Sequence, residues 1–525
     1  MPLPPRSSTA LEQSSSRFHD VTNEPLLWRY YCQSYYKSWD KRHDISSKLA
    51  SPVSSVDWKA LFVLRYRVDL SITRLLDSIL ASQTGRIEKF RAVIDFGYDA
   101  KDTLLRHCRV ESGEDHLARS IAVPEWVKLR RGEAVSLDRV LGAFDLFIPE
   151  SGYGDLDEIK MALDRIVSRF LASQSDVSLT PREKALAIAS WLHANDLTGI
   201  KPGREYHSLG HNFLGNWVWM PALCGFPLHV HVIITPQLGF DMDGNALGNK
   251  NMGLPMYLDP FRGARETLVA DLRDQLRFLG ASNVENSTFL GESLASEIVL
   301  RCGKNILNSI RSVSHQSNTH FTSVDIVSAR YAALWSSILL SGDSRPIELR
   351  HQLPWLMELF ATDFPSDIFL VEQYIVPLFH DLFEYEHILK TLHVMRAADK
   401  IPKQVRRRTG ENSNIRYRVG QVFRHRRYHY HAIITGWDSE CGAGEQWMRR
   451  MGIDRLQAGR HQSFYHVLVE DRSVRYVAEE NIQLTVPHLA ELPHNLTAIA
   501  GKHFKRWDQE VRAFVSNVRD EYPDD

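Results

Sequence analysis

Two stretches decide the fold of the C-terminal region: 417-YRVGQVFRHRRYHYHAIITGWD-438 and 462-QSFYHVLVEDRSVRYVAEENI-482. Their β-branched and aromatic residues predict strands over 417–423, 430–437, 463–469 and 474–477. Residues 470–473 hold the Asp and Ser that turns favour, so they predict a hairpin between the last two strands. Four or five short strands within about 70 residues predict a small β-barrel.

These stretches resemble the YccV-like domain, also called the hemimethylated-DNA-binding domain of the bacterial heat-shock protein Q type. The family pattern is "Y.vGqvv.Hr...yrgvI.gWD" and then "fYhvLvd....rYVaeENl", and nearly every element is present over 417–484. The sequence departs from the pattern in a long insertion, 439–461, before the third strand. We expect residues 479–481 to end the last strand, and the barrel to be lined or shaped by Tyr417, Gly420, Trp437, Tyr465 and Tyr476.

A basic cluster overlaps the start of this domain. Residues 401–430 contain nine Lys and Arg against one acid, Glu411. Phosphate neutralisation and base stacking predict a nucleic-acid contact made by Arg424, His425, Arg426, Arg427 and Tyr428. The alternative is a solvated basic edge on a barrel that binds protein. In eukaryotic chains that contain a domain of this kind, we favour binding of protein over binding of DNA.

The patterning between 53 and 310 changes from helical to mixed. Apolar residues at helical spacing predict a helix over 155–171, and Thr180-Pro181-Arg182-Glu183 predicts the capped start of another. The stretches 225-GFPLHVHVIITP-236 and 256-MYLDPF-261 predict two strands.

The run 155–263, with EYHSLGHNF, P-x-H and LDPF-x-G, resembles the transglutaminase-like domain of the SirB family. The resemblance puts His229 and Asp259 at the family's His and Asp positions, where the Asp orients an imidazole that deprotonates a Cys. Cys224 lies only five residues before His229, which leaves no room for the core helix that carries the family's nucleophile. We expect a catalytically silent block with a buried His229–Asp259 pair; the alternative is a cysteine-dependent transglutaminase-like enzyme or peptidase.

Two histidine groups are candidate metal ligands. His229 and His231 point to one face of a strand, and His425, His429 and His431 lie close together in the sequence. Zinc sites need three or four ligands, and no Cys, Asp or Glu completes either set. We therefore predict neither a metal nor another cofactor.

The N-terminal stretch 24-EPLLWRYYCQSYYKSWDKRH-43 has helical spacing, with an expected buried face formed by Leu26, Leu27, Tyr30, Tyr31 and Tyr35. Residues 21–39 resemble the closing half of an F-box, including its "LWR" signature. The family's opening half, "LP.EIL..IL..L...DL", is not found. The resemblance implies that Leu27 and Trp28 contact the Skp adaptor.

The remaining segments predict helices. Residues 319–395 have helical spacing and dense aromatics, which indicates a packed helical array, and 500-AGKHFKRWDQEVRAFVSNV-518 predicts a C-terminal helix before an acidic tail. The fold class is α+β multidomain, mostly helical, with a transglutaminase-like core and a small C-terminal barrel. The predicted boundaries are 1–52, 53–310, 311–400, 401–415, 416–485 and 486–525.

The composition of the chain disfavours several classes of function. The 525 residues carry 63 Lys and Arg against 64 Asp and Glu, so a polyelectrolyte that coats nucleic acid or membrane is disfavoured. No apolar run approaches the ~20 residues that cross a bilayer, and no membrane partner is expected. Five cysteines without C-x-x-C spacing indicate a reducing, intracellular location, in cytoplasm or nucleus.

The order of the three resemblances matches a eukaryotic F-box only protein family. That family implies a non-catalytic, substrate-recognition subunit of a Skp–cullin–F-box ubiquitin ligase, with the Skp adaptor, a cullin and a protein substrate as partners. A DNA-binding protein that binds duplex DNA through the YccV-like domain is the alternative.

Overall fold

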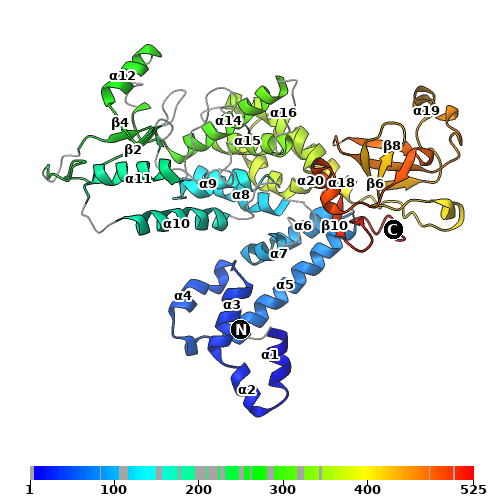
Figure 1. Cartoon of the computed structure of the whole chain (residues 1–525), viewed down its shortest axis with the longest axis horizontal. Coiled ribbons are helices and arrows are strands. Elements are labelled where there is room, and N and C mark those ends of the chain that lie inside the picture. Colours follow the sequence, from blue (N-terminus) through cyan, green and yellow to red (C-terminus); the bar gives the residue numbers. More distant parts are fainter. Residues whose placement is uncertain are drawn as a thin grey trace. The chain divides into compact units, whose positions relative to one another are not determined.

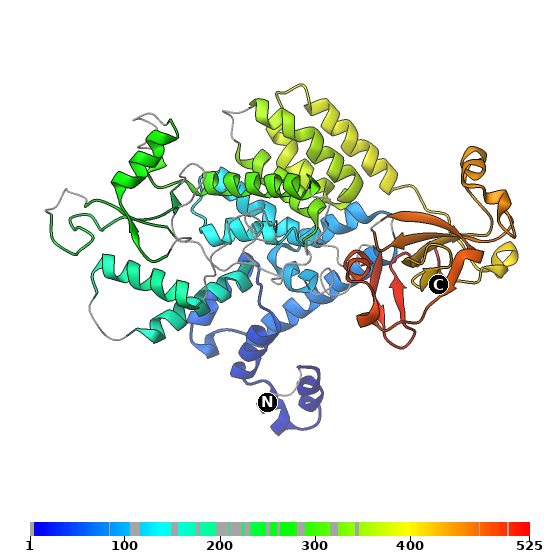
Figure 2. The same cartoon turned by 45° about the horizontal axis from the view of Figure 1, so that its top comes forward.

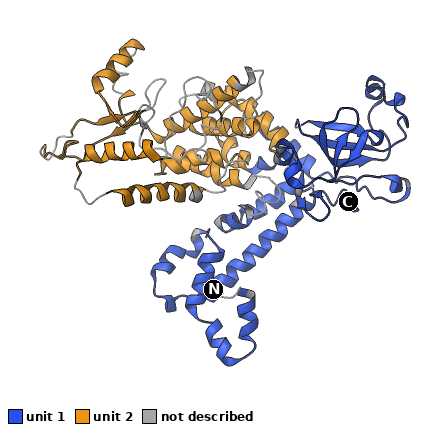
Figure 3. Ribbon diagram, viewed as in Figure 1, with its two compact units in different colours: residues 1–117, 365–369, 386–525 blue, residues 118–364, 370–385 orange. Residues whose placement is uncertain are grey.

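The computed structural model describes residues 5–82, 84–105, 116–148, 156–174, 179–195, 209, 223–224, 231–247, 253–259, 263–280, 289–315, 324–341, 346–471, 473–500 and 503–525. The chain divides into two compact units (Figure 3). Unit 1 comprises residues 1–117, 365–369 and 386–525, and unit 2 comprises residues 118–364 and 370–385.

Unit 1 begins with a run of helices, drawn in blue in Figure 1: α1 Pro5–Glu12, α2 Ser16–Thr22, α3 Pro25–Tyr35, α4 Ile45–Ala50, α5 Trp58–Ala81, α6 Arg86–Ile94 and α7 Lys101–Leu105. The helix α3 confirms the predicted N-terminal helix, but its expected buried face is wrong in part. Leu26, Tyr30 and Tyr35 are exposed, because the stripe that packs on Trp58 and Phe62 of α5 is formed by Trp28, Tyr31 and Cys32.

Unit 2 holds all but the first two residues of α8 (His116–Arg130), and it holds α9 Leu137–Asp145, α10 Leu156–Ser173 and α11 Pro181–Asn195. The predicted start of α11 is confirmed: the Thr180 amide donates to Glu183 Oε2 at 2.9 Å, and the Glu183 amide donates to Thr180 Oγ1 at 3.2 Å. These two bonds satisfy amides that a helix start leaves without intrahelical partners.

A small antiparallel sheet follows in unit 2, with strand order β1-β2-β3-β4. Its strands are β1 Leu223–Cys224, β2 His231–Ile234, β3 Met256–Leu258 and β4 Glu266–Thr267. The pairing of β2 with β3 places the two predicted strands side by side. Val232, Met256 and Leu258 supply the buried apolar side chains on one face of the pair.

Helices dominate the rest of unit 2 and the following segment. They are α12 Val269–Phe278, α14 Ala295–His315, α15 Ile326–Leu340, α16 Pro346–Asp363, α17 Ile368–Leu370 and α18 Tyr385–Asp399. The expected helical array is confirmed, and α15 is its most enclosed member, with Tyr331 and Trp335 fully buried.

The C-terminal part of unit 1 is an antiparallel sheet of order β8-β7-β6-β5-β9. Its strands, seen in Figure 2, are β5 Val422–His425, β6 His431–Asp438, β7 Phe464–Val469, β8 Val474–Ala478 and β9 Ile482–Leu484. The predicted β-rich region is confirmed, but the predicted barrel is an open sheet in the described residues. The turn η12 (Glu479–Asn481) ends β8 as expected, yet it carries the chain across to pair β9 with β5.

The apolar face of this sheet is covered by the segment that follows β9. The helix α20 (His494–Ala500) and the hairpin β10 (Phe504–Asp508) with β11 (Ala513–Ser516) bring Leu496, Phe504 and Phe514 onto Tyr417, Trp437 and Tyr465. Tyr476 lies instead with Phe464 beside the insertion helix α19 (Glu445–Met451). The sheet thus has an apolar core on this face.

The predicted helix over 500–518 is wrong. The Asp508 side chain accepts hydrogen bonds from the amides of Glu510 and Val511, at 2.9 and 3.1 Å, and turns the chain into the β10–β11 hairpin. The Phe514 amide then donates to the Gly420 carbonyl at 2.9 Å. Gly420 has φ +91°, and a Cβ there would lie 1.8 Å from the Phe514 carbonyl oxygen, so only glycine permits this approach.

Across the described parts of the chain, we find no helix that is both long and apolar enough to span a membrane.

Candidate functional site

The five residues predicted to contact a ligand lie together at the end of β5 and in the turn before β6. Arg424, Arg426 and Arg427 are exposed, and Tyr428 is 62% exposed. His425 differs from them, because only 5% of its surface is accessible. We call residues 424–428 the basic hairpin.

His425 organises the basic hairpin from inside. Its Nδ1 accepts hydrogen bonds from the amides of Arg427 and Tyr428, both at 3.1 Å, which places the ring proton on Nε2. Its own amide donates to the Tyr430 carbonyl at 2.9 Å, and its carbonyl accepts the His429 amide at 2.8 Å. Burial, and then the charges of Arg475 and Arg427, lower the pKa of His425 below its ordinary value. The neutral imidazole therefore holds the turn. The ligand contact of His425 stays a prediction, and it concerns a side chain that is buried.

Ring–ring and cation–π contacts connect the side chains of the basic hairpin. The His425 ring lies 4.9 Å from the Tyr428 ring and 4.8 Å from the Tyr430 ring. Arg427 lies 5.4 Å over Tyr428 at one end, and Arg475 lies 4.5 Å over Tyr430 at the other. These contacts fix the rings in advance, so an added aromatic or base ring meets an ordered surface at the exposed Tyr428.

The three arginines of the hairpin make contacts that leave their charge uncompensated. Arg424 Nε donates to the His429 carbonyl at 3.3 Å, and Arg426 Nε donates to the Ile482 carbonyl at 3.2 Å. Within the described residues, neither of these arginines nor Arg427 forms an ion pair with an acidic side chain. We call Arg424, Arg426 and Arg427 the hairpin triplet.

The arginines just before the domain are in a different state. Arg406 pairs with Asp438, and Arg408 Nη2 lies 2.5 Å from Asp525 Oδ1. Arg407 is 61% exposed and lies 3.7 Å from Asp524. We call Arg406, Arg407 and Arg408 the linker triplet; its positive charge is largely matched by the chain's own acids.

Asp438, at the end of β6, is the centre of a polar cluster. Its Oδ2 accepts hydrogen bonds from the Tyr476 hydroxyl at 2.7 Å and from His466 Nε2 at 3.2 Å, while Oδ1 faces Arg406. Burial opposes ionisation, but the hydrogen bonds from His466, Tyr476 and Arg406 outweigh it and hold the pKa of Asp438 well below its usual range. The cluster joins the linker to β6, β7 and β8, which makes it a structural joint of the domain.

Comparison with known proteins agrees with this geometry. The family described as hemimethylated DNA-binding protein, YccV like, matches residues 415–511. Residues 415–511 are a YccV-like domain. The range includes the basic hairpin and the sheet, whereas the linker triplet and residues 521–525 lie outside it.

Curated relatives give a second result. The chain is 39% identical to F-box only protein 21 of Homo sapiens and of Pongo abelii, and 40% identical to that of Mus musculus, over 102 residues in each case. Each match covers 19% of this chain and only 16% of the relative. No solved structure matches the chain.

Of the predicted transglutaminase-like pair, His229 and Asp259, the structure describes only Asp259. His229 lies outside the described residues, and Asp259 follows β3 with 6% of its surface exposed. The antiparallel register of β1 and β2 places Cys224 opposite His231. The silent pair stays a prediction.

The two predicted adaptor contacts on α3, Leu27 and Trp28, differ in how deeply they are buried. Trp28 is 1% exposed, and its Nε1 donates to the Thr22 carbonyl at 2.6 Å, so it belongs to the core of the N-terminal helices. Leu27 is half-buried against the same core. Leu26, Tyr30 and Tyr35, which the sequence predicts to be buried, are exposed on α3 and available to a partner.

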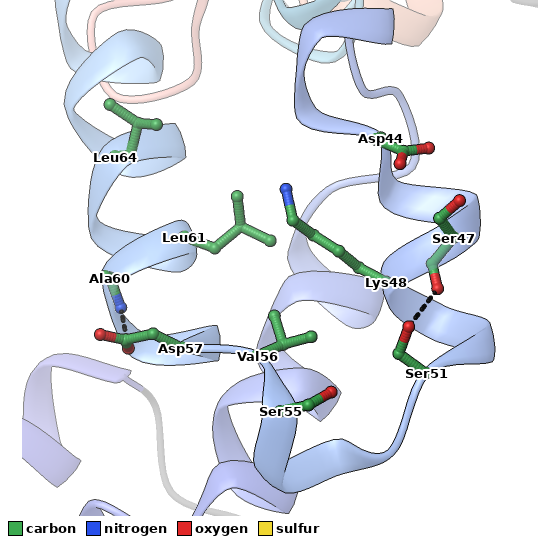
Figure 4. Close-up of a pocket in the computed structure, with 10 residues that line it drawn as sticks. All are labelled: Asp44, Ser47, Lys48, Ser51, Ser55, Val56, Asp57, Ala60, Leu61 and Leu64. Atoms are coloured by element: carbon green, nitrogen blue, oxygen red, sulfur yellow. Dashed lines mark hydrogen bonds between the residues drawn. The ribbon is translucent and has the colours of Figure 1, made fainter.

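A cavity of about 580 Å³ lies between α4 and the start of α5 (Figure 4). Asp44, Lys48, Asp57 and Leu61 are among its lining residues. The Lys48 amine already donates to the His43 carbonyl, and the Asp57 carboxylate caps α5 by accepting the Ala60 amide at 2.9 Å. In the described residues no group of three or more His, Cys, Asp or Glu is placed to hold a metal ion.

Proposed function

We propose that the chain is a substrate-recognition subunit of a Skp–cullin–F-box ubiquitin ligase and that it binds a protein partner through its YccV-like domain. The observation that supports this best is the similarity to F-box only protein 21, whose name states an F-box. A helical N-terminal region followed by a YccV-like domain agrees with the order of parts that the sequence predicted. In this role the chain binds and positions a substrate, and other subunits carry out ubiquitin transfer.

The test is copurification of the full chain with the Skp adaptor and a cullin. Trp28→Ala is a poor probe, because it would open the N-terminal core. Leu26→Glu is informative, since the side chain is 59% exposed on α3 and its loss leaves the core intact. Leu171→Glu on α10, where the leucine is 63% exposed, is the matched control.

We expect Leu26→Glu to reduce adaptor capture at least about tenfold, as for a side chain central to an interface, and Leu171→Glu to leave it unchanged. No capture of the adaptor by the unaltered chain, or by a chain in which a complete F-box has been restored, would contradict the proposal.

A second candidate is binding of duplex DNA by the basic hairpin. The observation in its favour is the hairpin triplet, with three exposed guanidinium groups beside the exposed ring of Tyr428. Its test is the salt dependence of duplex binding by the full chain, because phosphate neutralisation gives affinity that falls steeply with salt.

A further inference from the structure

Trp437 and Arg408 bind the buried side chain of Asp525. Trp437 Nε1 donates to Asp525 Oδ2 at 2.8 Å, and Arg408 donates to Asp525 Oδ1 from Nε at 2.6 Å. The Asp525 carboxylate is 1% exposed there, and the Arg408 side chain is 15% exposed. We call Trp437 and Arg408 the carboxylate seat.

The seat is positioned by the YccV-like domain itself. Arg408 Nη1 donates to the Ile415 carbonyl and Nη2 to the Tyr417 carbonyl, both at 2.7 Å, and its guanidinium lies 5.6 Å over the Trp437 ring. Two backbone carbonyls and an indole ring therefore orient the guanidinium independently of the acid. A planar donor fixed in this way suits a carboxylate better than a mobile lysine would.

A second contact lies three residues before the acid. Tyr522 is 8% exposed, and its ring meets the Trp437 ring edge-on at 5.5 Å. Its hydroxyl lies over Gly436, where a Cβ would be 2.6 Å from that oxygen. The surface thus distinguishes two features of its occupant, an aromatic ring and a carboxylate three positions later.

We propose that the carboxylate seat is a recognition site for acidic peptides of the pattern Tyr-x-x-Asp, and that residues 521–525 occupy it in cis as a built-in competitor. Charge complementarity favours such a partner, because Arg407 lies beside the seat with 61% of its side chain exposed and meets Asp524 only at 3.7 Å. A segment tethered in cis acts at an effective concentration in the millimolar range, so it hides a site of moderate affinity. The proposal does not depend on the ligase function.

The experiment measures binding of a fluorescein-labelled peptide, VRDEYPDD with an amidated end, to the full chain by fluorescence anisotropy. The variants are Asp525→Asn, which keeps the side-chain size, and Arg408→Gln combined with Asp525→Asn. Asp520→Asn is the matched control, because it makes the same charge change at an exposed position directly before residues 521–525. A peptide with its last Asp changed to Asn controls for the carboxylate.

We expect the Asp525→Asn chain to bind the peptide at least about tenfold more tightly than the unaltered chain, and the Asp520→Asn chain to behave as unaltered. The Asn-ended peptide should bind at least about tenfold more weakly, as expected for a lost charge-assisted contact. Adding Arg408→Gln to Asp525→Asn should abolish binding.

Three outcomes overturn the proposal: no gain in binding for Asp525→Asn, equal binding of the two peptides, or binding that survives Arg408→Gln. The chain that carries both Arg408→Gln and Asp525→Asn could fail to fold, which its thermal unfolding would show. In that case the binding of the two peptides by the size-conserving Asp525→Asn chain decides the proposal. None of these measurements involves the Skp adaptor, so a failure here is separate from a failure of the ligase proposal.

Discussion

The linker triplet and the hairpin triplet are alike in sequence and opposite in structure. Both are groups of three arginines within 401–430, a stretch with a single acid. In the linker triplet, Arg406 faces Asp438 and Arg408 faces Asp525, whereas the hairpin triplet has no acidic partner in the described residues. The difference shows that a basic run becomes a basic surface only where distant parts of the fold leave it unmatched.

The two triplets therefore have different expected roles. Removing one member of an enclosed ion pair leaves the other buried and unpaired, which lowers stability. Exposed charges contribute little to stability and much to the capture of an anion. Mutations of Arg406 or Arg408 in the linker triplet should lower the free energy of unfolding, and mutations in the hairpin triplet should weaken binding of an anion.

The largest effect is expected for Gly420→Ala, which displaces the hairpin leading to residues 521–525. The new Cβ would meet the Phe514 carbonyl oxygen at 1.8 Å, in a backbone conformation with φ +91° that L side chains rarely adopt. We expect a loss of about 3 kcal/mol or more in the local free energy of unfolding, measured by native-state hydrogen exchange of the β6 amides. Gly410→Ala is the control: its φ is +61° but no atom lies within 4 Å, so a loss of only ~1 kcal/mol is expected. Equal losses would mean that the Gly420–Phe514 approach is not tight.

Arg408→Ala should have the next largest effect. It leaves the buried Asp525 carboxylate with the Trp437 indole and removes two donors to backbone carbonyls. We expect a loss of roughly 2–3 kcal/mol in the same exchange measurement. Arg407→Ala, at a side chain that is 61% exposed, should change it by less than about 0.5 kcal/mol. A similar loss in both variants would remove the distinction within the linker triplet.

The hairpin triplet should show the reverse behaviour. Changing Arg424, Arg426 and Arg427 together to Ala should leave the β6 exchange rates nearly unchanged. If the domain binds duplex DNA, affinity should fall at least about tenfold, and the slope of log affinity against log salt should become shallower by up to about 3. Equal DNA binding by the triple variant and the unaltered chain would exclude the basic hairpin as the DNA contact.

Much of the fold was predictable because its signals are local. The capping box at Thr180 and Glu183, the strands around Ile433 and Val467 and the helix containing Trp28 all follow from residues within one turn or one strand. The predicted helix over 500–518 is wrong, because the hairpin found there depends on the Asp508 turn and on docking of Phe514 against Gly420, which is distant in the sequence.

The candidate site divides in the same way. That residues 424–428 lie together follows from the sequence, since they are consecutive; their contact with a ligand stays a prediction. It did not show that His425 is buried, because its position depends on the inward face of β5 and on Tyr430. Nor did it show the contact of Arg408 with Asp525, which joins residues 117 positions apart. A signal was present in the matched acidic run at 520–525, but pairing it with the linker required the fold.

The smallest effect is expected from pH, and it tests whether His425 holds the basic hairpin as a neutral ring. Its pKa is lowered in the folded chain by burial and by Arg475 and Arg427, while in the unfolded chain it returns to about 6.5. Below pH 6.5 the unfolded turn gains a proton that the folded turn resists, so the stability of the turn is complete above this value and is lost as the pH falls. Protonation of Nδ1 also removes the acceptor for the amides of Arg427 and Tyr428. After correction for intrinsic exchange rates, these two amides should lose hydrogen-exchange protection between pH 7.5 and 5, and the non-titrating His425→Asn variant should show no such change. A pH dependence that persists in His425→Asn would assign the effect to another group, and the hairpin would then owe its order to the arginine and tyrosine contacts alone.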